Sequence, residues 1–181
     1  MKTLYIGHTG ETPLGEIWVA VSESGLVAVD FPSTREAFTI ALKQRHAAEV
    51  VFDLQRTAEA VRQLREYAAG ERRTFTLPVD WSGMGTFQQK VLELTRQIPY
   101  GETRTYQHLA AQLGNPRAAR AIARAQATNP IPLVIPCHRV IGSDGALRGY
   151  GAGKGIATKQ QLLDLEAHSK PTALDAGKNT P

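Results

Sequence analysis

Cys137 is the only cysteine in the chain, and it stands directly beside His138 and Arg139 in an otherwise apolar stretch, residues 135–140. A single thiol cannot form an internal disulfide, so the residue has either a packing role or a chemical one. Burial as a small hydrophobic side chain is one interpretation, because free cysteine is among the most buried residue types. The neighbours favour the other interpretation: Pro136 removes a backbone donor, His138 supplies a titratable base, and Arg139 supplies a permanent cation. Cys137 and His138 are therefore a candidate nucleophile and its activator.

The composition indicates a globular protein of ordinary size. The chain has 181 residues, of which 42% are hydrophobic and 21% are charged, enough for one domain or for two small ones. Residues 1–15 contain no apolar segment of secretory length, and no stretch approaches the roughly 18 apolar residues that a membrane span needs. We therefore expect a cytoplasmic protein without membrane contact, in a reducing compartment where a reactive thiol persists.

Charge is unevenly distributed along the chain. Residues 1–82 hold 9 Lys and Arg against 11 Asp and Glu, whereas residues 83–181 hold 12 against 6. The half that contains the cysteine therefore has a net charge of +6. A solvated basic surface is the simpler explanation of a small excess, but the asymmetry favours an anionic partner.

The N-terminal half has the pattern of an α/β unit. Three short segments rich in β-branched and apolar residues, broken by Gly, Pro and Ser, predict a small antiparallel sheet over residues 4–8, 16–21 and 25–31. Apolar residues at three- and four-residue spacing then predict helices over residues 36–46 and 54–69. Residues 76–84 have turn chemistry without a helical period, and we interpret them as an interdomain linker.

The C-terminal half is predicted to be mostly helical, with helices over residues 86–97, 105–113 and 117–126. Gly114 can take a left-handed cap and Pro116 stands at the first position of the next helix, an arrangement typical of a helix-turn-helix. Such helix pairs also occur in many proteins that bind no nucleic acid.

The face of the second helix in this pair supports binding to nucleic acid. Arg117, Arg120 and Arg124 fall within about 60° of one another around the helix, and alanines, Ala119 among them, would let the helix approach a phosphate backbone closely. A solvated arginine face is the alternative, but residues 103–143 contain no Asp or Glu to pair with these charges. Because the helix has few of the amide side chains that read base edges, we expect contacts with the backbone and shape of DNA more than with its sequence.

A set of short motifs occurs in a fixed order along the chain: NPRAAR at residues 115–120, NP at 129–130, IPCHRV at 135–140, LRGY at 147–150 and LLxxE at 162–166. TPLG at residues 12–15 and IPYGE at residues 98–102 precede them. Together these motifs resemble the O6-alkylguanine-DNA alkyltransferases, also called methylated-DNA–protein-cysteine methyltransferases. The resemblance covers nearly the whole chain.

The resemblance implies a catalytic set. Cys137 would accept the alkyl group, His138 would act on it as a base through a water molecule, and Glu166 would orient and charge the imidazole. Tyr106 would donate a hydrogen bond to the guanine ring as the leaving group gains negative charge. Without the family, Glu166 would be an exposed residue of an amphipathic last helix, residues 159–166, and Tyr106 a half-buried aromatic at a helix start.

The resemblance also implies contacts with a flipped nucleotide. Arg120 would enter the base stack and fill the space that the damaged base leaves. Asn129 would brace the turn before the cysteine, although an Asn-Pro turn explains that residue by itself. Backbone groups of Cys137 and Val140 would recognise the exocyclic amine of the base, and Tyr150 and Gly151 would line the pocket.

Two features differ from part of the family. Some members have Ser where this chain has Gly151, so that only a backbone N–H could contact O6 at this position. Some relatives hold a structural zinc ion with several cysteines, which a chain with one cysteine cannot do. The glycine-rich residues 142–155 lack the Lys-Ser/Thr ending of a phosphate loop, and we interpret them as a flexible pocket wall.

We therefore expect two domains. Residues 1–82 would form an α/β domain with a small antiparallel sheet and helices, in a ribonuclease H-like fold, and residues 83–167 a mostly α-helical domain with the helix-turn-helix and the acceptor cysteine. Residues 168–181 are predicted to be a disordered tail.

The expected function is irreversible, single-turnover transfer of an alkyl group from O6-alkylguanine in double-stranded DNA to Cys137. The protein would act as a monomer, without cofactor or metal. A non-transferring damage-binding relative and a thiol hydrolase with the same Cys-His-Glu set remain alternatives, and repair of O4-alkylthymine is left open.

Overall fold

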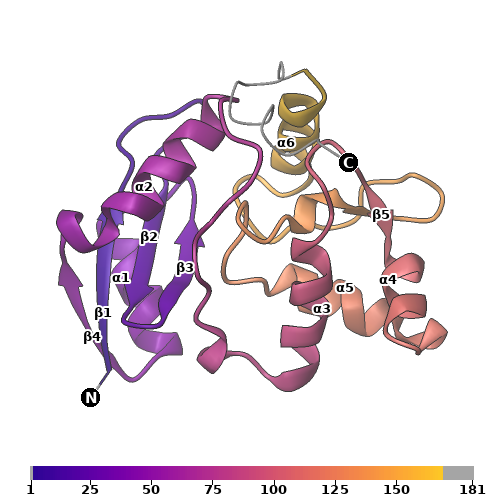
Figure 1. Cartoon of the computed structure of the whole chain (residues 1–181), viewed down its shortest axis with the longest axis horizontal. Helices are drawn as coiled ribbons and strands as arrows, with labels where there is room; N and C mark the ends of the chain where they lie inside the picture. The colour runs from indigo at the N-terminus through magenta and orange to yellow at the C-terminus, as the bar shows by residue number, and fades with distance from the viewer. Residues whose placement is uncertain (1, 169–181) are drawn as a thin grey trace, which may run out of the picture.

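The N-terminal half is built on a four-stranded sheet in the order β3-β2-β1-β4 (Figure 1). The computed structural model describes residues 2–168. Its first sheet consists of β1 (Lys2–His8), β2 (Trp18–Ser22), β3 (Gly25–Asp30) and β4 (Ala48–Phe52). The first three strands pair antiparallel, as the sequence predicts, whereas β4 pairs parallel with β1 and makes the sheet mixed.

The sequence did not predict β4. The strand is short, lies at the edge of the sheet and has mostly half-exposed side chains, so its apolar alternation is weak. Its position is set by long-range pairing with β1, from Lys2 opposite Ala48 to Ile6 opposite Phe52. A local pattern cannot reveal such a register.

Two helices flank this sheet, α1 (Arg35–Arg45) and α2 (Leu54–Ala68), close to their predicted bounds. Each begins after a residue whose side chain caps the first turn, Thr34 for α1 and Asp53 for α2. The caps satisfy backbone N–H groups that have no partner within the helix, and they determine where the helices begin.

The two helices cover opposite faces of the sheet. Trp18 of β2 lies in one apolar cluster with Phe38 of α1, whereas the next residue, Val19, lies in another with Leu64 of α2. This alternation follows from the two-residue period of a strand. The result is an α/β layer in which α2 faces the C-terminal half (Figure 1).

The expected linker is tied to the edge of the sheet. Leu26 N donates to Pro78 O at 2.8 Å, and Asp80 N donates to Leu26 O at 2.9 Å, so the segment runs beside β3. The Asp80 carboxylate also accepts a hydrogen bond from Lys2 Nζ at 2.7 Å. A short 3-10 turn, η1 (Trp81–Gly83), then leads into the C-terminal half.

As far as residue 168, the C-terminal half is mostly helical and has one two-stranded pairing, β5 with β6. Its elements are α3 (Thr86–Arg96), β5 (Arg104–Thr105), α4 (Tyr106–Gln112), η2 (Pro116–Ala118), α5 (Ala119–Ala127), η3 (Cys137–Arg139), β6 (Val140–Ile141) and α6 (Ile156–His168). Val91, Leu109 and Ile122, from α3, α4 and α5, share a buried cluster.

The predicted helix-turn-helix is formed by α4 and α5. Gly114 has a φ of 70° and ends the first helix in a left-handed cap. Asn115 accepts a hydrogen bond from Arg117 N and caps the turn that follows. The second helix differs from its prediction in one respect: it enters through the 3-10 turn η2 and becomes α-helical at Ala119.

The two halves share one core. Leu64 and Tyr67 of α2 pack in the same cluster as Ile135 and Leu162 of the C-terminal half. The loop that leads to Cys137 therefore rests on α2, which limits where the thiol can lie.

The last helix, α6, is longer than predicted and includes His168, which the sequence placed in the tail. The other residues of that expected tail, 169–181, lie outside the described part of the chain. Within residues 2–168, no helix is long and apolar enough to cross a membrane.

Candidate active site

Cys137 begins the 3-10 turn η3 and is 5% exposed. Asn129 Nδ2 donates to Ile135 O at 2.9 Å and to Cys137 Sγ at 3.2 Å, and Asn129 Oδ1 accepts from Ile131 N at 3.0 Å. Asn129 thus holds both ends of the apolar segment before the thiol and contacts the sulfur itself.

The environment keeps the thiol protonated at rest. Burial raises the pKa of Cys137 to about 11, although the hydrogen bond from Asn129 and the positive charge of Lys159 act in the opposite direction. Because the thiolate is the reactive form, a thiol with this pKa needs a base that removes its proton.

His138 has the protonation pattern of such a base. Its Nε2 lies 2.8 Å from Glu166 Oε1, and both side chains are buried. An ionised carboxylate can only accept, so Nε2 carries the ring proton and Nδ1 is left as an acceptor. Nδ1 is buried without a hydrogen-bond partner among residues 2–168. Burial lowers the pKa of His138 even though Glu166 acts to raise it, so the neutral imidazole is favoured.

Glu166 is a buried anion with donors on both oxygens. Arg139 donates to it through Nε at 2.9 Å and Nη2 at 2.8 Å, Gly101 N donates at 3.0 Å, and the Tyr67 hydroxyl donates at 2.7 Å. Burial disfavours the charge, but hydrogen bonds and charges from His138 and Arg139 outweigh burial and hold the pKa of Glu166 well below its usual range. Glu166 is therefore buried, and the alternative of an exposed residue on an amphipathic helix is wrong.

Tyrosines lie close to the acceptor. Tyr106 is the first residue of α4 and is buried, more deeply than expected from the sequence alone. Burial raises its pKa, and so does its proximity to Cys137, so the phenol stays protonated and can donate. Tyr150 meets the His138 ring edge-on with centroids 6.5 Å apart, and its buried hydroxyl has no partner within the described chain.

Gly151 packs directly against the end of α5. A Cβ at this position would overlap the carbonyl oxygen of Ala127. The pocket wall therefore lies too close to the end of α5 to accept a side chain at position 151.

The backbone carbonyl groups of Cys137 and Val140, the two residues expected to recognise the base, already accept hydrogen bonds. Val140 O accepts from Lys159 Nζ at 2.6 Å, and Cys137 O accepts from Val140 N within the turn. A carbonyl oxygen has two lone pairs, so each retains capacity for one further donor.

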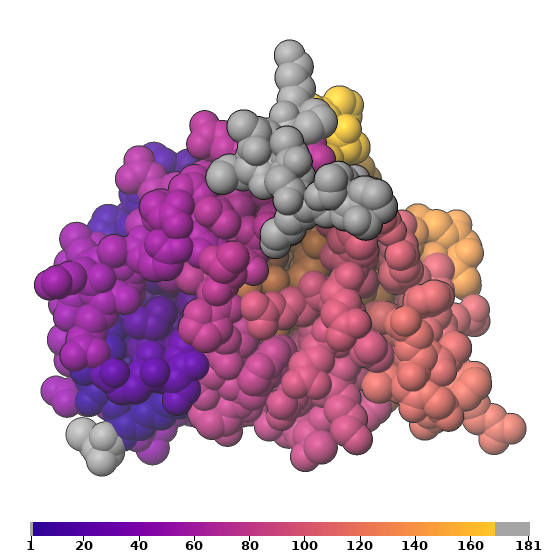
Figure 2. Space-filling model, viewed as in Figure 1, coloured from indigo at the N-terminus to yellow at the C-terminus, as the bar shows by residue number. Residues whose placement is uncertain are grey.

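The arginines of the second helix form an exposed cationic face. Arg117, Arg120 and Arg124 are exposed, and none of them has an ion pair with a residue of the described chain. The opposite side of the helix is buried through Ile122 in the shared cluster with α4, and Ala119 lies at the edge of that cluster and stays partly exposed. These helices occupy the end of the molecule away from the sheet, where Figure 2 shows their surface in salmon.

Two residues of the site, Tyr67 and Lys159, were missed from the sequence, and Arg139 was noted only as a cation beside the thiol. Tyr67 contacts Glu166 from the N-terminal half, Arg139 pairs with Glu166, and Lys159 is fully buried and donates to backbone carbonyls. Lys159 stands two helical turns before Glu166 on α6, a same-face spacing that could have marked it. Tyr67 has no local signal, since its partners lie 71 and 99 residues away in the sequence.

Comparison with known proteins identifies the family. Residues 2–81 match "6-O-methylguanine DNA methyltransferase, ribonuclease-like domain", and residues 86–168 match "6-O-methylguanine DNA methyltransferase, DNA binding domain". The chain is 42% identical over 158 residues to the constitutive methylated-DNA–protein-cysteine methyltransferase of Bacillus subtilis, covering 87% of this chain and 93% of the relative. It is 50% identical over 117 residues to the Mycobacterium leprae methylated-DNA–protein-cysteine methyltransferase, covering 65% and 69%.

Solved structures agree with this assignment. The O6-methylguanine methyltransferase of Mycobacterium tuberculosis aligns with a TM-score of 0.76 at 35% identity over 97% of this chain and 99% of that one. The M. tuberculosis OGT in complex with DNA aligns with a TM-score of 0.74 at 35% identity, over 96% and 98%. The resemblance in the motifs around Cys137 is confirmed, and the chain belongs to the 6-O-methylguanine DNA methyltransferase family.

Proposed function

We propose that this protein repairs O6-alkylguanine in double-stranded DNA by direct reversal, moving the alkyl group to Cys137 in one irreversible step. The observation that carries the proposal is the environment of the chain's single cysteine. The Cys137 thiol is buried and accepts a hydrogen bond from Asn129, and its neighbour His138 is paired with the buried Glu166. The relatives named as methylated-DNA–protein-cysteine methyltransferases and the DNA complex of the M. tuberculosis protein support it.

The chemistry follows from the protonation states. A bridging water passes the thiol proton to His138 Nδ1, and the ionised Glu166 stabilises the imidazolium that forms. The sulfur forms a bond to the alkyl carbon while the bond from that carbon to O6 breaks, and the electron pair leaves with guanine. Tyr106 donates a hydrogen bond to the guanine ring as negative charge grows there. The thioether is stable, so each molecule reacts once.

The basic helix delivers the damaged base. Arg117 and Arg124 contact phosphates, Ala119 allows close approach, and Arg120 fills the stack after the nucleotide flips out. The flipped base is received by the backbone at Cys137 and Val140, beside Tyr150 and Gly151, with Asn129 holding the acceptor loop.

The same proposal includes the organisation of the chain. A ribonuclease H-like domain over residues 1–82 supports a DNA-binding and acceptor domain over residues 83–167, and the protein acts as a monomer in the cytoplasm. The basic C-terminal half and the shared core between the halves support this arrangement.

Intact-mass measurement tests the function. Incubation with a duplex that contains one O6-methylguanine should add one methyl group per protein molecule, located on Cys137 by peptide mapping. Cys137→Ala should bind the duplex but gain no mass. Binding without mass gain by the unaltered protein would identify a non-transferring damage binder, and repeated turnover would identify a hydrolase.

A further inference from the structure

We propose that Tyr67, on α2 of the N-terminal half, is a positioning residue for the His138–Glu166 pair. Its hydroxyl holds the carboxylate oxygen that orients the His138 ring. The inference rests on the proposed alkyl transfer, and it assigns the N-terminal half a direct part in the acceptor machinery.

The geometry places three polar atoms in a closed triangle. Tyr67 Oη donates to Glu166 Oε1 at 2.7 Å, and the same oxygen lies 2.8 Å from His138 Nε2. Tyr67 Oη is itself 3.3 Å from His138 Nε2. All three side chains are buried, so water does not compete for these contacts. A movement of the hydroxyl would therefore move the oxygen that fixes the imidazole.

The phenol is always a donor here. Burial raises the pKa of Tyr67 well above its usual value, and the negative charge of Glu166 raises it further. The carboxylate has about four lone-pair positions, and His138, Arg139 and Gly101 already supply four N–H donors to it. The hydroxyl is thus not required to satisfy Glu166.

The Tyr67 hydroxyl changes the negative charge that Glu166 presents to His138. A donor on Oε1 withdraws part of its negative charge, so the imidazolium is stabilised less and Nδ1 is less basic. Without the hydroxyl, Oε1 would be more negative and the pKa of His138 would rise. The titratable and charged groups that face His138 are Glu166 and Lys159 of α6, Arg139 and Cys137 of η3, Tyr67 of α2 and Tyr150 of the pocket wall. Glu166 is the anion among them, and Tyr67 acts on it.

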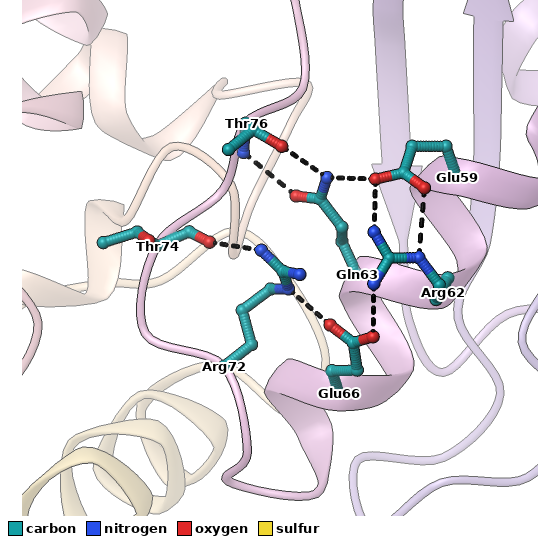
Figure 3. A network of polar contacts seen from close by, with 7 residues as sticks. All are labelled: Glu59, Arg62, Gln63, Glu66, Arg72, Thr74 and Thr76. Atoms are coloured by element: carbon teal, nitrogen blue, oxygen red, sulfur yellow. Dashed lines mark hydrogen bonds and ion pairs between the residues drawn. The ribbon is translucent and has the colours of Figure 1, made fainter. Parts of the chain in front are cut away.

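Both halves of the chain hold Tyr67 in place. The Tyr67 ring packs against Phe75 of the N-terminal half at a centroid distance of 5.4 Å and against Tyr100 of the C-terminal half at 6.2 Å. Next to it, a polar network ties α2 to the segment that follows it (Figure 3). In that network Glu66 accepts from Arg72 at 2.6 Å. These hydrogen bonds on the polar side of α2 therefore stabilise the helical turn that carries Tyr67 on its buried side.

The network continues one turn earlier on α2. Gln63 donates to Thr76 Oγ1 at 2.7 Å and accepts from Thr76 N at 3.0 Å (Figure 3). These bonds hold the segment that carries Phe75, which packs on the Tyr67 ring. A tyrosine on the apolar face of a helix is expected only to pack in the core, whereas the fold places the Tyr67 hydroxyl against Glu166 and His138.

Two substitutions with opposite expected effects test the inference. The rate of single-turnover transfer from free O6-benzylguanine is measured against pH, since this substrate needs no DNA. Tyr67→Phe keeps the ring but removes the donor. The acid limb of the profile reports the loss of a proton from His138. In Tyr67→Phe its midpoint should move to a pH that is higher by roughly half a unit to one unit. The substitution should also lower the plateau rate by about threefold to tenfold, because the His138 imidazole is oriented less well.

Trifluorotyrosine at position 67 keeps both ring and donor and makes the phenol more acidic. It is a stronger donor and should move the acid limb downward. Shifts of opposite sign in the two proteins support the inference. A merely structural role would lower the melting temperature of Tyr67→Phe and leave both pH profiles unchanged, which would overturn it.

Matched controls separate the hydroxyl from packing. Tyr5→Phe makes the same chemical change on β1, where the ring lies 4.2 Å from the Arg56 guanidinium, and should not move the profile. Phe75→Leu loosens the packing beside the Tyr67 ring. It should shift the profile when Tyr67 is present and have little effect in the Tyr67→Phe background, so an equal shift in both backgrounds would refute the inference. If the unaltered protein transfers no alkyl group to Cys137, the proposed function itself fails. If it does transfer one and the position 67 variants behave like it, only the role of Tyr67 is wrong.

Discussion

Replacing Glu166 by Gln should affect stability and reactivity together, because one buried carboxylate serves both. Glu166 is 4% exposed and pairs with Arg139, whose side chain is 6% exposed. Gln keeps the shape of the side chain but removes its charge. Arg139 would keep its 2.6 Å hydrogen bond to Ile98 O and lose its anion. Removing one partner of a buried pair costs about 3–5 kcal/mol, so we expect the free energy of unfolding to fall by that amount.

The effect on reactivity has a separate cause. Without the anion, the Nε2–H tautomer of His138 is selected less strongly, because only the amide oxygen of Gln can accept, and the protonated form loses its counter-charge. A general base contributes a factor of about 10²–10⁴, so Glu166→Gln should slow alkyl transfer by about 10² or more. Duplex DNA and free O6-benzylguanine should be affected alike, since the residue acts on the thiol. His138→Ala should show the same equality between the two substrates.

Urea unfolding and single-turnover kinetics measure the two effects on one preparation. Glu102→Gln is the matched control, because Glu102 is a half-exposed carboxylate paired with Arg104 at 2.8 Å, and its loss should cost no more than about 1 kcal/mol. Should Glu166→Gln behave like this control in unfolding and react at nearly the normal rate, the buried anion has neither role.

The stability difference should depend on pH in a defined direction. The pKa of Glu166 is lower in the folded protein than its value of about 4.3 in an unfolded chain. Its contribution is therefore fully present above about pH 4.3 and is lost as the pH falls toward the folded value. The gap between the unaltered protein and Glu166→Gln should narrow on acidification, and a gap that stays constant from neutral pH to pH 3 would contradict this assignment.

Three further predictions concern the DNA face and the pocket. Arg120→Ala should slow repair of duplex DNA, because extrusion of the base becomes less favourable by a few kcal/mol, but should leave the reaction of free O6-benzylguanine almost unchanged; equal losses would make Arg120 a structural residue. Arg124→Ala should reduce the slope of log affinity against log salt by about 0.9 from an expected value of roughly −3 to −4, and an unchanged slope would remove Arg124 from the phosphate contacts. Gly151→Ala should destabilise the protein by about 1–3 kcal/mol and slow alkyl transfer, because the new Cβ overlaps Ala127 O. An unchanged melting temperature and transfer rate would show that the pocket wall can move away from α5.

Local chemistry explains which elements the sequence could predict. The helices have apolar faces at helical spacing and side-chain caps, such as Asp53 before α2, so their positions follow from neighbouring residues. The turn between α4 and α5 was predicted for the same reason, since Gly114 and Asn115 act within a few residues of themselves. The strand β4 was missed because its partner, β1, precedes it by more than 40 residues.

The same distinction applies to the site. His138 and Cys137 are neighbours in the sequence, and their residue types alone indicate a nucleophile and a base. What decides their protonation is not local: the thiol's high pKa comes from burial, and the anion beside the imidazole comes from α6.

Tyr67 is the extreme case. A tyrosine on the apolar face of a helix predicts only packing, because nothing in α2 distinguishes a hydroxyl that meets solvent from one that meets a carboxylate 99 residues further along the chain. The distinction arises only when the two halves share a core, since that packing brings α2 against the acceptor loop. A residue whose role depends on the packing of two halves can be found only from the structure. The pH profile of Tyr67→Phe tests whether the packing of α2 against the acceptor loop affects the basicity of His138.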